Sequence, residues 1–335
     1  MSRSYWTADE LVECEFPAPR WAIPGIVSEG VTLLAGAPKV GKSWLSLGLA
    51  LAVACGGRAL GSVPVAAGDV LYLALEDTGR RLKSRVLKLL AGDPAPARLA
   101  LTTFCEPLPA GGLERIDQWL TDHPEARLVI VDVLARVRGQ APANQNAYDL
   151  DYHALTALKH TADQHRVAIV VVHHTRKAAS EDFLDLVSGT QGLAGAADSV
   201  LVLRRDRGQH DAILGVTGRD IEEAEHPLKF TPDTGSWSLL NGPVTDYRLG
   251  DTRRDVLHYL RRHDTATPSE VARGLDIPEG TAKSTLFRMA KDNQVDTDGR
   301  GHYFEPATSA TRATETDPQG CTGCAGCTPQ LPTVA

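Results

Sequence analysis

The sequence lacks the features of a membrane or secreted protein. No apolar run reaches the length needed to span a bilayer, and the first residues, Met1-Ser-Arg-Ser-Tyr-Trp6, do not form the apolar core of a signal peptide. An excess of basic residues is also missing, because the formal net charge is −7. This charge argues against a generally basic nucleic-acid coat, although it leaves room for a local basic channel. We therefore expect a cytoplasmic protein without membrane contact.

Cysteine is scarce, and aromatic side chains make up only 5% of the 335 residues. Three scattered cysteines indicate free thiols in a reducing compartment: Cys14, Cys55 and Cys105. The other three form a C-x2-C-x2-C cluster: Cys321, Cys324 and Cys327. This spacing would suit zinc or an iron–sulfur cluster, but the usual fourth ligand is missing. The surrounding Thr, Ala, Pro and Gly favour a disordered tail over 306–335, with metal binding as the alternative.

A phosphate-binding signature is what the sequence does contain. Gly36-Ala-Pro-Lys-Val-Gly-Lys42-Ser43 fits the P-loop pattern G-x-x-x-x-G-K-[ST] at every fixed position. An apolar run at 31–35 predicts a strand before it, and a Leu- and Ala-rich stretch at 44–54 predicts a helix after it, which disfavours a chance match. We expect Lys42 to reach the β- and γ-phosphates of ATP and Ser43 to bind Mg²⁺. The expected ATP contacts are Gly36, Ala37, Pro38, Lys39, Val40, Gly41, Lys42, Ser43 and Trp44.

Apolar strands and helical stretches alternate along the first part of the chain. Continuous Val, Ile and Leu runs predict buried strands at 70–75, 99–104, 128–131, 168–172 and 200–203. Helical patterns lie between them at 80–90, 113–120 and 148–165. This alternation predicts an α/β fold, a mostly parallel sheet flanked by helices. Later antiparallel strands are expected at 212–217, 228–230 and 236–240.

Changes in composition divide the chain further. Prolines break regular structure in a lead-in over 1–28, the α/β domain covers 29–240, and 241–250 forms a linker. A smaller domain follows at 251–305. Its helical patterns lie at 253–262, 268–274 and 279–292, before a hairpin over 295–304. Three helices and a hairpin are the order of a winged helix.

The third helix of this smaller domain has two different faces. Its inward face is apolar: Ala282, Leu286 and Met289. Its outer face carries our candidate DNA contacts: Lys283, Ser284, Arg288 and Lys291. The segment contains nine Lys and Arg against ten Asp and Glu, so protein binding is the alternative to DNA binding.

Polar residues end three of the predicted strands. A P-loop ATPase needs a second carboxylate for Mg²⁺, and Asp132 supplies it after the run Leu128-Val-Ile-Val131. Another strand ends in Glu76-Asp77; we expect Glu76 to activate water, with Asp77 as the alternative. A third ends in His173-His174, one of which we expect to contact the γ-phosphate. Arg176 and Lys177 then open a Ser- and Gly-rich loop that either carries DNA contacts or is simply solvated.

The order of these motifs resembles the RecA-like P-loop ATPase core. It is most similar to the branch that contains hexameric replicative helicases of the plasmid RepA type, often described as AAA-family ATPases of mobile elements. The motifs are the P-loop, Leu75-Glu-Asp77, Val129-Ile-Val-Asp132, and His173-His-Thr-Arg-Lys177 followed by Ser188-Gly-Thr190. The similarity covers about residues 20 to 240.

The resemblance implies residue roles in addition to that of Lys42. Glu76 would be the catalytic base and His174 the γ-phosphate sensor. Arg85 would act at a subunit interface, and Arg219 would enter the neighbouring subunit's site; a surface salt bridge is the alternative for either arginine. The resemblance also implies a homo-oligomeric ring, expected to be a hexamer, that moves single-stranded DNA. Because we find no primase segment, a primase or initiator protein is an expected partner.

The expected function is Mg²⁺-dependent ATP hydrolysis that drives DNA unwinding in replication of a plasmid, phage or integrated element. The alternative is a RecA-like regulatory switch whose winged helix binds operator DNA or a partner protein. A scaffold that binds nucleotide without hydrolysis is disfavoured by four intact residues: Lys42, Ser43, Asp132 and Glu76.

Overall fold

The computed structural model describes residues 5–139, 147–175, 191–205, 211–240 and 251–306. The chain divides into two compact units, Met1–Arg248 and Leu249–Ala335. Among the described residues, no helix combines the length and the apolar character that a membrane crossing requires.

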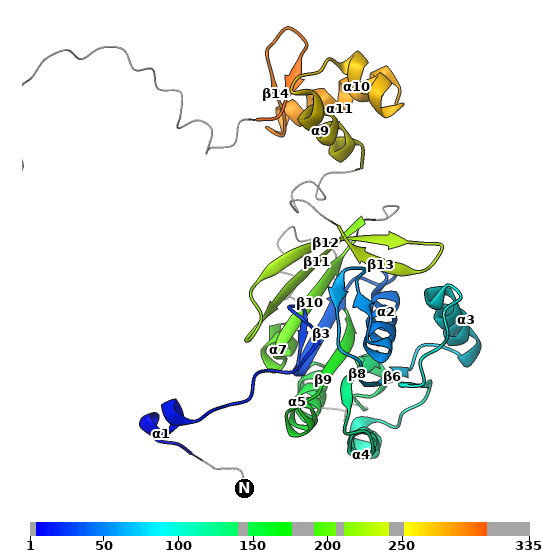
Figure 1. Cartoon of the computed structure of the whole chain (residues 1–335), viewed down its shortest axis with the longest axis vertical. Coiled ribbons are helices and arrows are strands. Elements are labelled where there is room, and N and C mark those ends of the chain that lie inside the picture. Colours follow the sequence, from blue (N-terminus) through cyan, green and yellow to red (C-terminus); the bar gives the residue numbers. More distant parts are fainter. Residues whose placement is uncertain (1–4, 140–146, 176–190, 206–210, 241–250, 307–335) are drawn as a thin grey trace, which may run out of the picture. The chain divides into compact units, whose positions relative to one another are not determined.

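A nine-stranded sheet forms the centre of the first unit, in the order β13-β12-β11-β10-β3-β9-β8-β6-β7 (Figure 1). The parallel strands are β3 (Gly30–Gly36), β6 (Asp69–Ala74), β7 (Leu99–Thr102), β8 (Ala126–Asp132), β9 (Ala168–His174) and β10 (Ser199–Arg204). The antiparallel strands are β11 (Asp211–Gly218), β12 (Ala224–Thr231) and β13 (Ser236–Leu239). The predicted mostly parallel sheet with late antiparallel strands is confirmed.

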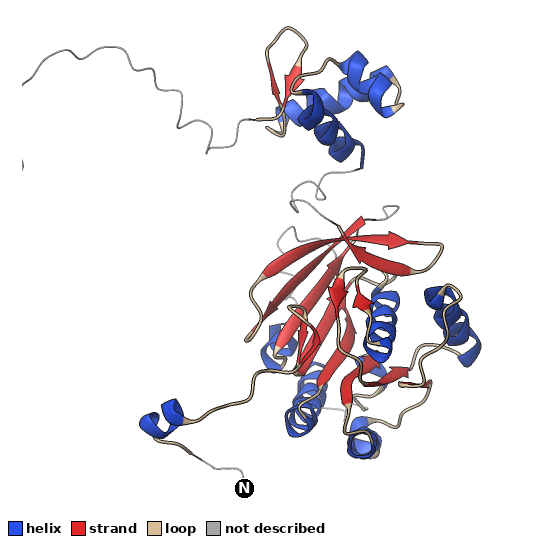
Figure 2. Cartoon of the chain, viewed as in Figure 1, coloured by secondary structure: helices blue, strands red, loops and turns tan. Residues whose placement is uncertain are grey.

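Helices cover both faces of this sheet (Figure 2). One face packs against α2 (Lys42–Cys55) and α3 (Gly79–Leu90). The other packs against α4 (Gly112–Asp122), α5 (Ala147–His165) and α7 (Gln191–Ala196). Successive side chains of a strand point to opposite faces, so Leu34 joins the first core cluster and Leu33 the second. Burial on both faces explains why these strands are continuous apolar runs.

The N-terminal segment contains more regular structure than its prolines predict. A short helix, α1 (Ala8–Glu13), is followed by a hairpin of β1 (Trp21–Ile23) and β2 (Val27–Ser28). Pro24 and Gly25 lie in the turn of this hairpin, and Gly25 has the positive φ of 74° that a glycine tolerates. Ile23 and Val27 are fully buried in the core cluster that includes α2. Pro24 therefore lies between two short strands and does not prevent them from forming.

Short elements complete the first unit. They are the hairpin of β4 (Arg58–Ala59) and β5 (Val63–Pro64) and the 3₁₀ turns η1 (Leu108–Ala110) and η2 (Leu134–Arg136). The registers of the parallel strands pair Gly36 with His174 and Ala74 with Asp132. The carboxyl ends of four strands thus meet at one edge of the sheet, which is where open α/β sheets bind ligands.

The second unit has its own core. Its elements are α9 (Asp251–His263), α10 (Pro268–Leu275), α11 (Glu279–Lys291), β14 (Asp296–Thr297) and β15 (Tyr303–Phe304). Thr267 and Glu270 form a capping box that starts α10. Side chains from all three helices bury together: Val256, Leu260, Val271, Ala282, Leu286 and Met289. The three helices and the hairpin follow the predicted winged-helix order.

Candidate active site

The P-loop joins the end of β3 to the start of α2, and two glycines permit its path. Gly36 and Gly41 have φ values of 156° and 110°. A Cβ on Gly36 would lie 2.6 Å from the carbonyl oxygen of Leu203, and one on Gly41 would lie 2.7 Å from the Trp237 ring. The indole nitrogen of Trp237 also donates to the Gly41 carbonyl at 3.3 Å. The loop is thus held closely against β10 and β13, and α2 begins directly behind it, where the first-turn N–H groups of a helix are available to an anion.

Lys42 is folded back onto the P-loop. Its Nζ donates to the carbonyl oxygens of Gly36 and Ala37 at 2.7 and 2.9 Å and lies 3.0 Å from Nδ1 of His174. An ammonium has three protons to donate, so these contacts use all of them. Burial lowers the pKa of Lys42 to about 8, although Asp132 and Glu76 oppose the shift. Lys42 thus binds two carbonyl oxygens and a ring nitrogen, whereas the P-loop pattern predicts that it binds phosphate oxygens.

This contact selects one tautomer of a neutral His174 ring. A charged Lys42 has nothing to accept with, so Nδ1 of His174 must be the acceptor and Nε2 must carry the proton. Nε2 lies 3.5 Å from Oε2 of Glu76. Lys42, His174 and Glu76 therefore form a continuous polar chain from the P-loop to the end of β6. His173 lies next to them in the sequence, and burial lowers the pKa of His173.

Asp132 ends β8 in a buried polar cluster. Its Oδ2 accepts a hydrogen bond from the Tyr72 hydroxyl at 2.8 Å, and the Tyr72 oxygen lies 3.0 Å from Oγ of Ser46 on α2. A carboxylate only accepts, so Tyr72 donates to Asp132, and the single hydroxyl proton of Ser46 is shared between the Tyr72 oxygen and the Ser43 carbonyl oxygen, which lies 3.3 Å from Oγ of Ser46. Tyr72 is 1% exposed, and burial together with the negative charge of Asp132 raises the pKa of its hydroxyl well above the usual value for a tyrosine. The Tyr72 hydroxyl thus keeps its proton and directs it to Asp132.

The other oxygen of Asp132 has no partner. Its Oδ1 is buried and makes no hydrogen bond with any described residue. Burial raises the pKa of Asp132, and hydrogen bonds from Tyr72 and Ser43 limit the rise. An unsatisfied buried carboxylate oxygen is costly unless something else binds it. Beside the Ser43 hydroxyl at the start of α2, this oxygen fits a hard cation such as Mg²⁺.

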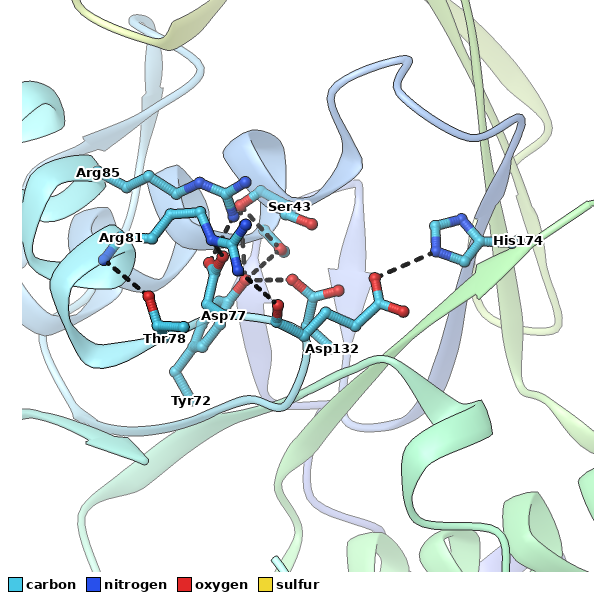
Figure 3. Close-up of polar contacts among 10 residues, drawn as sticks. Ser43, Tyr72, Asp77, Thr78, Arg81, Arg85, Asp132 and His174 are labelled. Atoms are coloured by element: carbon cyan, nitrogen blue, oxygen red, sulfur yellow. Dashed lines mark hydrogen bonds and ion pairs between the residues drawn. The ribbon is translucent and has the colours of Figure 1, made fainter. Parts of the chain in front are cut away.

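Glu76 and Asp77 follow β6 but have different surroundings. Asp77 accepts from Nε of Arg81 at 2.8 Å and from Nη1 of Arg85 at 2.6 Å, and its side chain is 9% exposed (Figure 3). Glu76 keeps a carboxylate that is 47% exposed and faces His174. Asp77 is therefore occupied in holding α3, whereas Glu76 is accessible to water. Arg85 lies in an ion pair within its own chain.

Several side chains at this edge were not predicted from the sequence. Tyr72 could have been noticed, because a phenol inside an aliphatic buried strand needs a hydrogen-bond partner. Trp237 could not, because its contact with Gly41 spans 196 residues. Phe230 and Trp44 pack beside it, with ring centroids 5.0 Å from Trp237 to Phe230 and 6.4 Å from Phe230 to Trp44. Together with Trp44, which was among the expected ATP contacts, these aromatic rings pack next to the P-loop.

Arg219 lies away from this cluster. It follows β11, whose Gly218 pairs with Ser199, and Ser199 in turn pairs with Thr32 near the start of β3. Arg219 is therefore at the edge of the sheet opposite the P-loop. It lies 3.6 Å from Asp198, and its side chain is 61% exposed. The nucleotide site of its own chain is out of its reach.

The candidate DNA contacts fall into two groups. Arg176 and Lys177 lie outside the described residues, as do Cys321, Cys324 and Cys327. The other group is exposed on α11, namely Lys283, Ser284, Arg288 and Lys291. Phe287 is 66% exposed between them, whereas Ala282, Leu286 and Met289 are fully buried. The inward and outward faces predicted for this helix are therefore present.

Comparisons with known proteins agree with this organisation. A family profile described as an AAA domain matches residues 2–180, and one described as a helix-turn-helix domain matches residues 250–289. The chain is similar to a solved structure described as an ATPase domain, with a TM-score of 0.52 and 15% identity over 64% of this chain and 85% of that chain. No curated protein matches the sequence.

A second solved structure is that of a DnaB-like replicative helicase, described together with its interactions with primase. The TM-score is 0.53 and the identity 16%, over 64% of this chain and 58% of that chain. At these identities the likeness shows a shared fold. The predicted ATPase fold, a mostly parallel sheet flanked by helices, is confirmed, and the unit predicted as a winged helix matches a helix-turn-helix domain.

Proposed function

Since the chain belongs to the AAA domain family, we propose that it is a Mg²⁺-dependent ATP hydrolase that works as a ring on single-stranded DNA. One observation carries the proposal. One edge of the sheet brings together three groups: Lys42, the unsatisfied Oδ1 of Asp132 and the exposed carboxylate of Glu76. These are a phosphate-binding cation, a metal ligand and a base, which hydrolysis of a phosphoanhydride requires.

Binding of ATP would change the partners of Lys42. Phosphate oxygens are stronger acceptors for an ammonium than the carbonyls of Gly36 and Ala37, so Lys42 would turn to the β- and γ-phosphates. Ser43 and Asp132 would hold Mg²⁺, which neutralises phosphate charge when bound. The N-terminus of α2 would add backbone N–H groups to the phosphates.

Hydrolysis would follow from the position of Glu76. Its carboxylate would take a proton from a water molecule that attacks the γ-phosphorus, and the bond between this phosphorus and the bridging oxygen would break. His174 contacts both Lys42 and Glu76, so loss of the γ-phosphate would alter both of its contacts. This connection supports the γ-phosphate sensor role.

Arg219 supports assembly into a ring, which we propose to be a hexamer. An exposed guanidinium at the edge opposite the P-loop can serve a nucleotide only in a neighbouring copy. A cation supplied in this way would stabilise charge that develops on the transferred phosphoryl group. Arg85, paired with Asp77 and 5.4 Å from the Trp44 ring centroid, lies closer to its own site. We propose that Arg85 acts at the interface between subunits while it keeps its ion pair with Asp77.

DNA movement is the proposed work of this ring. Lys283, Ser284, Arg288 and Lys291 on α11 would contact DNA from the helix-turn-helix unit, and Arg176 and Lys177 would contact the strand from the ATPase unit. We place this activity in the cytoplasm, in replication of a plasmid, phage or integrated element. Because one structural relative is described with its interactions with primase, we propose a primase or initiator protein as a partner.

The second candidate is a regulatory ATPase switch. The near balance of charge in 251–305 favours the form of this switch in which the helix-turn-helix unit binds a partner protein, since strongly basic surfaces are usual where a domain holds DNA tightly. In that case ATP binding would change the assembly, and the helix-turn-helix unit would hold an operator or a partner protein. Hydrolysis would then not depend on single-stranded DNA.

Steady-state ATP hydrolysis with and without single-stranded DNA separates the two candidates. We expect hydrolysis that needs Mg²⁺ and rises several-fold with DNA, and we expect Lys42→Ala to abolish it while the unfolding temperature is kept. Full activity in Lys42→Ala would refute the assignment of the P-loop. If the protein assembles and its hydrolysis rate is the same with and without single-stranded DNA, the regulatory switch would be favoured.

A further inference from the structure

The N-terminal arm, defined here as residues 5–16, is acidic and apolar. Its four charged side chains are all acidic: Asp9, Glu10, Glu13 and Glu15. None of the residues of α1 is buried, and Val12 and Phe16 are 86% and 62% exposed. Glu13 and Glu15 form no ion pair with a described residue. Phe16 also packs edge-on against Trp6 of the same arm, with ring centroids 6.2 Å apart. The arm therefore presents apolar side chains that stay largely exposed and, in Glu13 and Glu15, two carboxylates without an ion-pair partner among the described residues.

The helix α3 has the opposite character. Its charged side chains are all basic: Arg80, Arg81, Lys83, Arg85 and Lys88. Arg81 and Arg85 are engaged by Asp77, but Arg80 and Lys83 have no ion-pair partner within the described part of the chain. Leu87 lies one turn after Lys83, on the same side of the helix, and is 58% exposed. An exposed leucine beside unpaired cations is thus available on this helix.

We propose that the N-terminal arm of one copy docks on α3 of a second copy of this chain. Val12 and Phe16 would cover Leu87, while Glu13 and Glu15 would pair with Arg80 and Lys83. Exposed pairs of this kind contribute little one by one, but here they coincide with an apolar contact and set which surfaces meet. Long-range attraction between the acidic arm and the basic helix would also favour the encounter.

The proposal deepens the proposed ring and rests on it. The helix α3 begins three residues after Glu76, so an arm docked there would attach a neighbour to the element that follows the catalytic strand end. The contact is also electrostatic and exposed. Raising the salt concentration should therefore weaken assembly while ATP binding at the P-loop is much less affected.

Two charge-reversal variants of the full chain test the contact. The arm variant carries Glu13→Lys and Glu15→Lys, and the helix variant carries Arg80→Glu and Lys83→Glu. Each variant alone would bring like charges together, so we expect the concentration for half-assembly to rise about 10-fold or more by light scattering. An equal mixture of the two variants should recover assembly, because each arm then meets an α3 of opposite charge.

Controls distinguish this contact from a general effect of surface charge and from a contact within one chain. Asp122→Lys with Glu125→Lys makes the same change of charge as the arm variant elsewhere on the surface and should leave assembly unchanged. A chain that carries all four reversals should assemble alone. If that chain assembles but the mixture of the two variants does not, the arm docks within its own chain and the proposal is wrong. Normal assembly of either variant alone would also overturn it.

Binding of a fluorescent ATP analogue by every variant keeps the outcome distinct from the proposed ATPase function. Neither pair of substitutions touches the P-loop or Asp132, so affinity for the analogue should change less than about 3-fold. Intact binding with no change in assembly would reject the arm contact and leave the nucleotide site standing. Recovery of assembly in the mixture without any hydrolysis would support the arm contact and count against the ATPase.

Discussion

Replacing Tyr72 by Phe tests how the site prepares Asp132 for a metal ion. The substitution keeps the ring in its buried place and removes one hydroxyl, which donates to Oδ2 of Asp132 at 2.8 Å. Ser46 would not be stranded, because its Oγ already lies 3.3 Å from the backbone oxygen of Ser43. The lost interaction is thus mainly the one that orients and stabilises the Asp132 carboxylate.

The size of the effect follows from the charge of the acceptor. A hydrogen bond to an ionised group contributes about 1.5–3 kcal/mol, and loss of such a partner behind a metal ligand lowers metal affinity about 10–100-fold. We therefore expect the Mg²⁺ concentration for half-maximal hydrolysis to rise by roughly that factor in Tyr72→Phe. Nucleotide binding measured in EDTA should stay within about 2-fold, because Lys42 and the P-loop are unchanged.

The effect should also grow as the pH falls. Burial raises the pKa of Asp132, and the Tyr72 hydrogen bond opposes that rise. Without the bond the pKa rises further, so a larger fraction of Asp132 is protonated at mildly acidic pH and cannot bind Mg²⁺. The ratio of half-saturating Mg²⁺ between Tyr72→Phe and the unchanged chain should increase from neutral to acidic pH.

The assay is a Mg²⁺ titration of hydrolysis at saturating ATP, repeated at several pH values. Ser46→Ala is the matched control, since it removes the neighbour of Tyr72 and leaves the bond to Asp132; it should shift the midpoint less than about 3-fold. An unchanged Mg²⁺ midpoint in folded Tyr72→Phe would refute the reasoning. So would an equal loss of nucleotide binding in EDTA.

Two further predictions concern Lys42 and Arg219. The pKa of Lys42 is about 8 when it is buried against carbonyls, and nearby phosphates should raise this pKa. ATP binding above pH 8 should therefore take up nearly one proton per site and weaken as the pH rises. Calorimetry in buffers of different ionisation enthalpy measures the proton uptake, and Lys42→Arg should show none. Mixing Arg219→Ala with Glu76→Gln should recover part of the hydrolysis that each variant lacks, because some mixed interfaces contain both intact residues; no recovery at any ratio would argue against a shared site.

The strand ends were accessible to sequence reasoning because each is encoded locally. Apolar runs that stop at Glu76, Asp132 and His174 reveal both a buried strand and the polar edge where it ends. Contacts between distant segments are not encoded in this way. The sequence alone leaves Asp77 beside Glu76 as a rival base, and only packing shows that two arginines from α3 occupy it.

The N-terminal segment shows a different limit. Pro17, Pro19 and Pro24 locally oppose helices and central strands, and this local signal predicts an irregular segment. Burial of Ile23 and Val27 against the core favours a hairpin in spite of it. The phosphate-binding role of Lys42 could be predicted from its motif. The lowered pKa of Lys42 could not, because it depends on burial by residues as far as 132 positions away in the sequence.

The placement of Arg219 has a consequence for how activity is counted. If a complete site needs the P-loop of one copy and Arg219 of the next, a lone chain carries two halves at opposite edges of one sheet and has no working site. An open string of copies would have one fewer working site than it has members, and only closure into a circle would make the numbers equal. Turnover per chain would then report whether the circle is closed, and unassembled copies would leave the cellular ATP pool untouched.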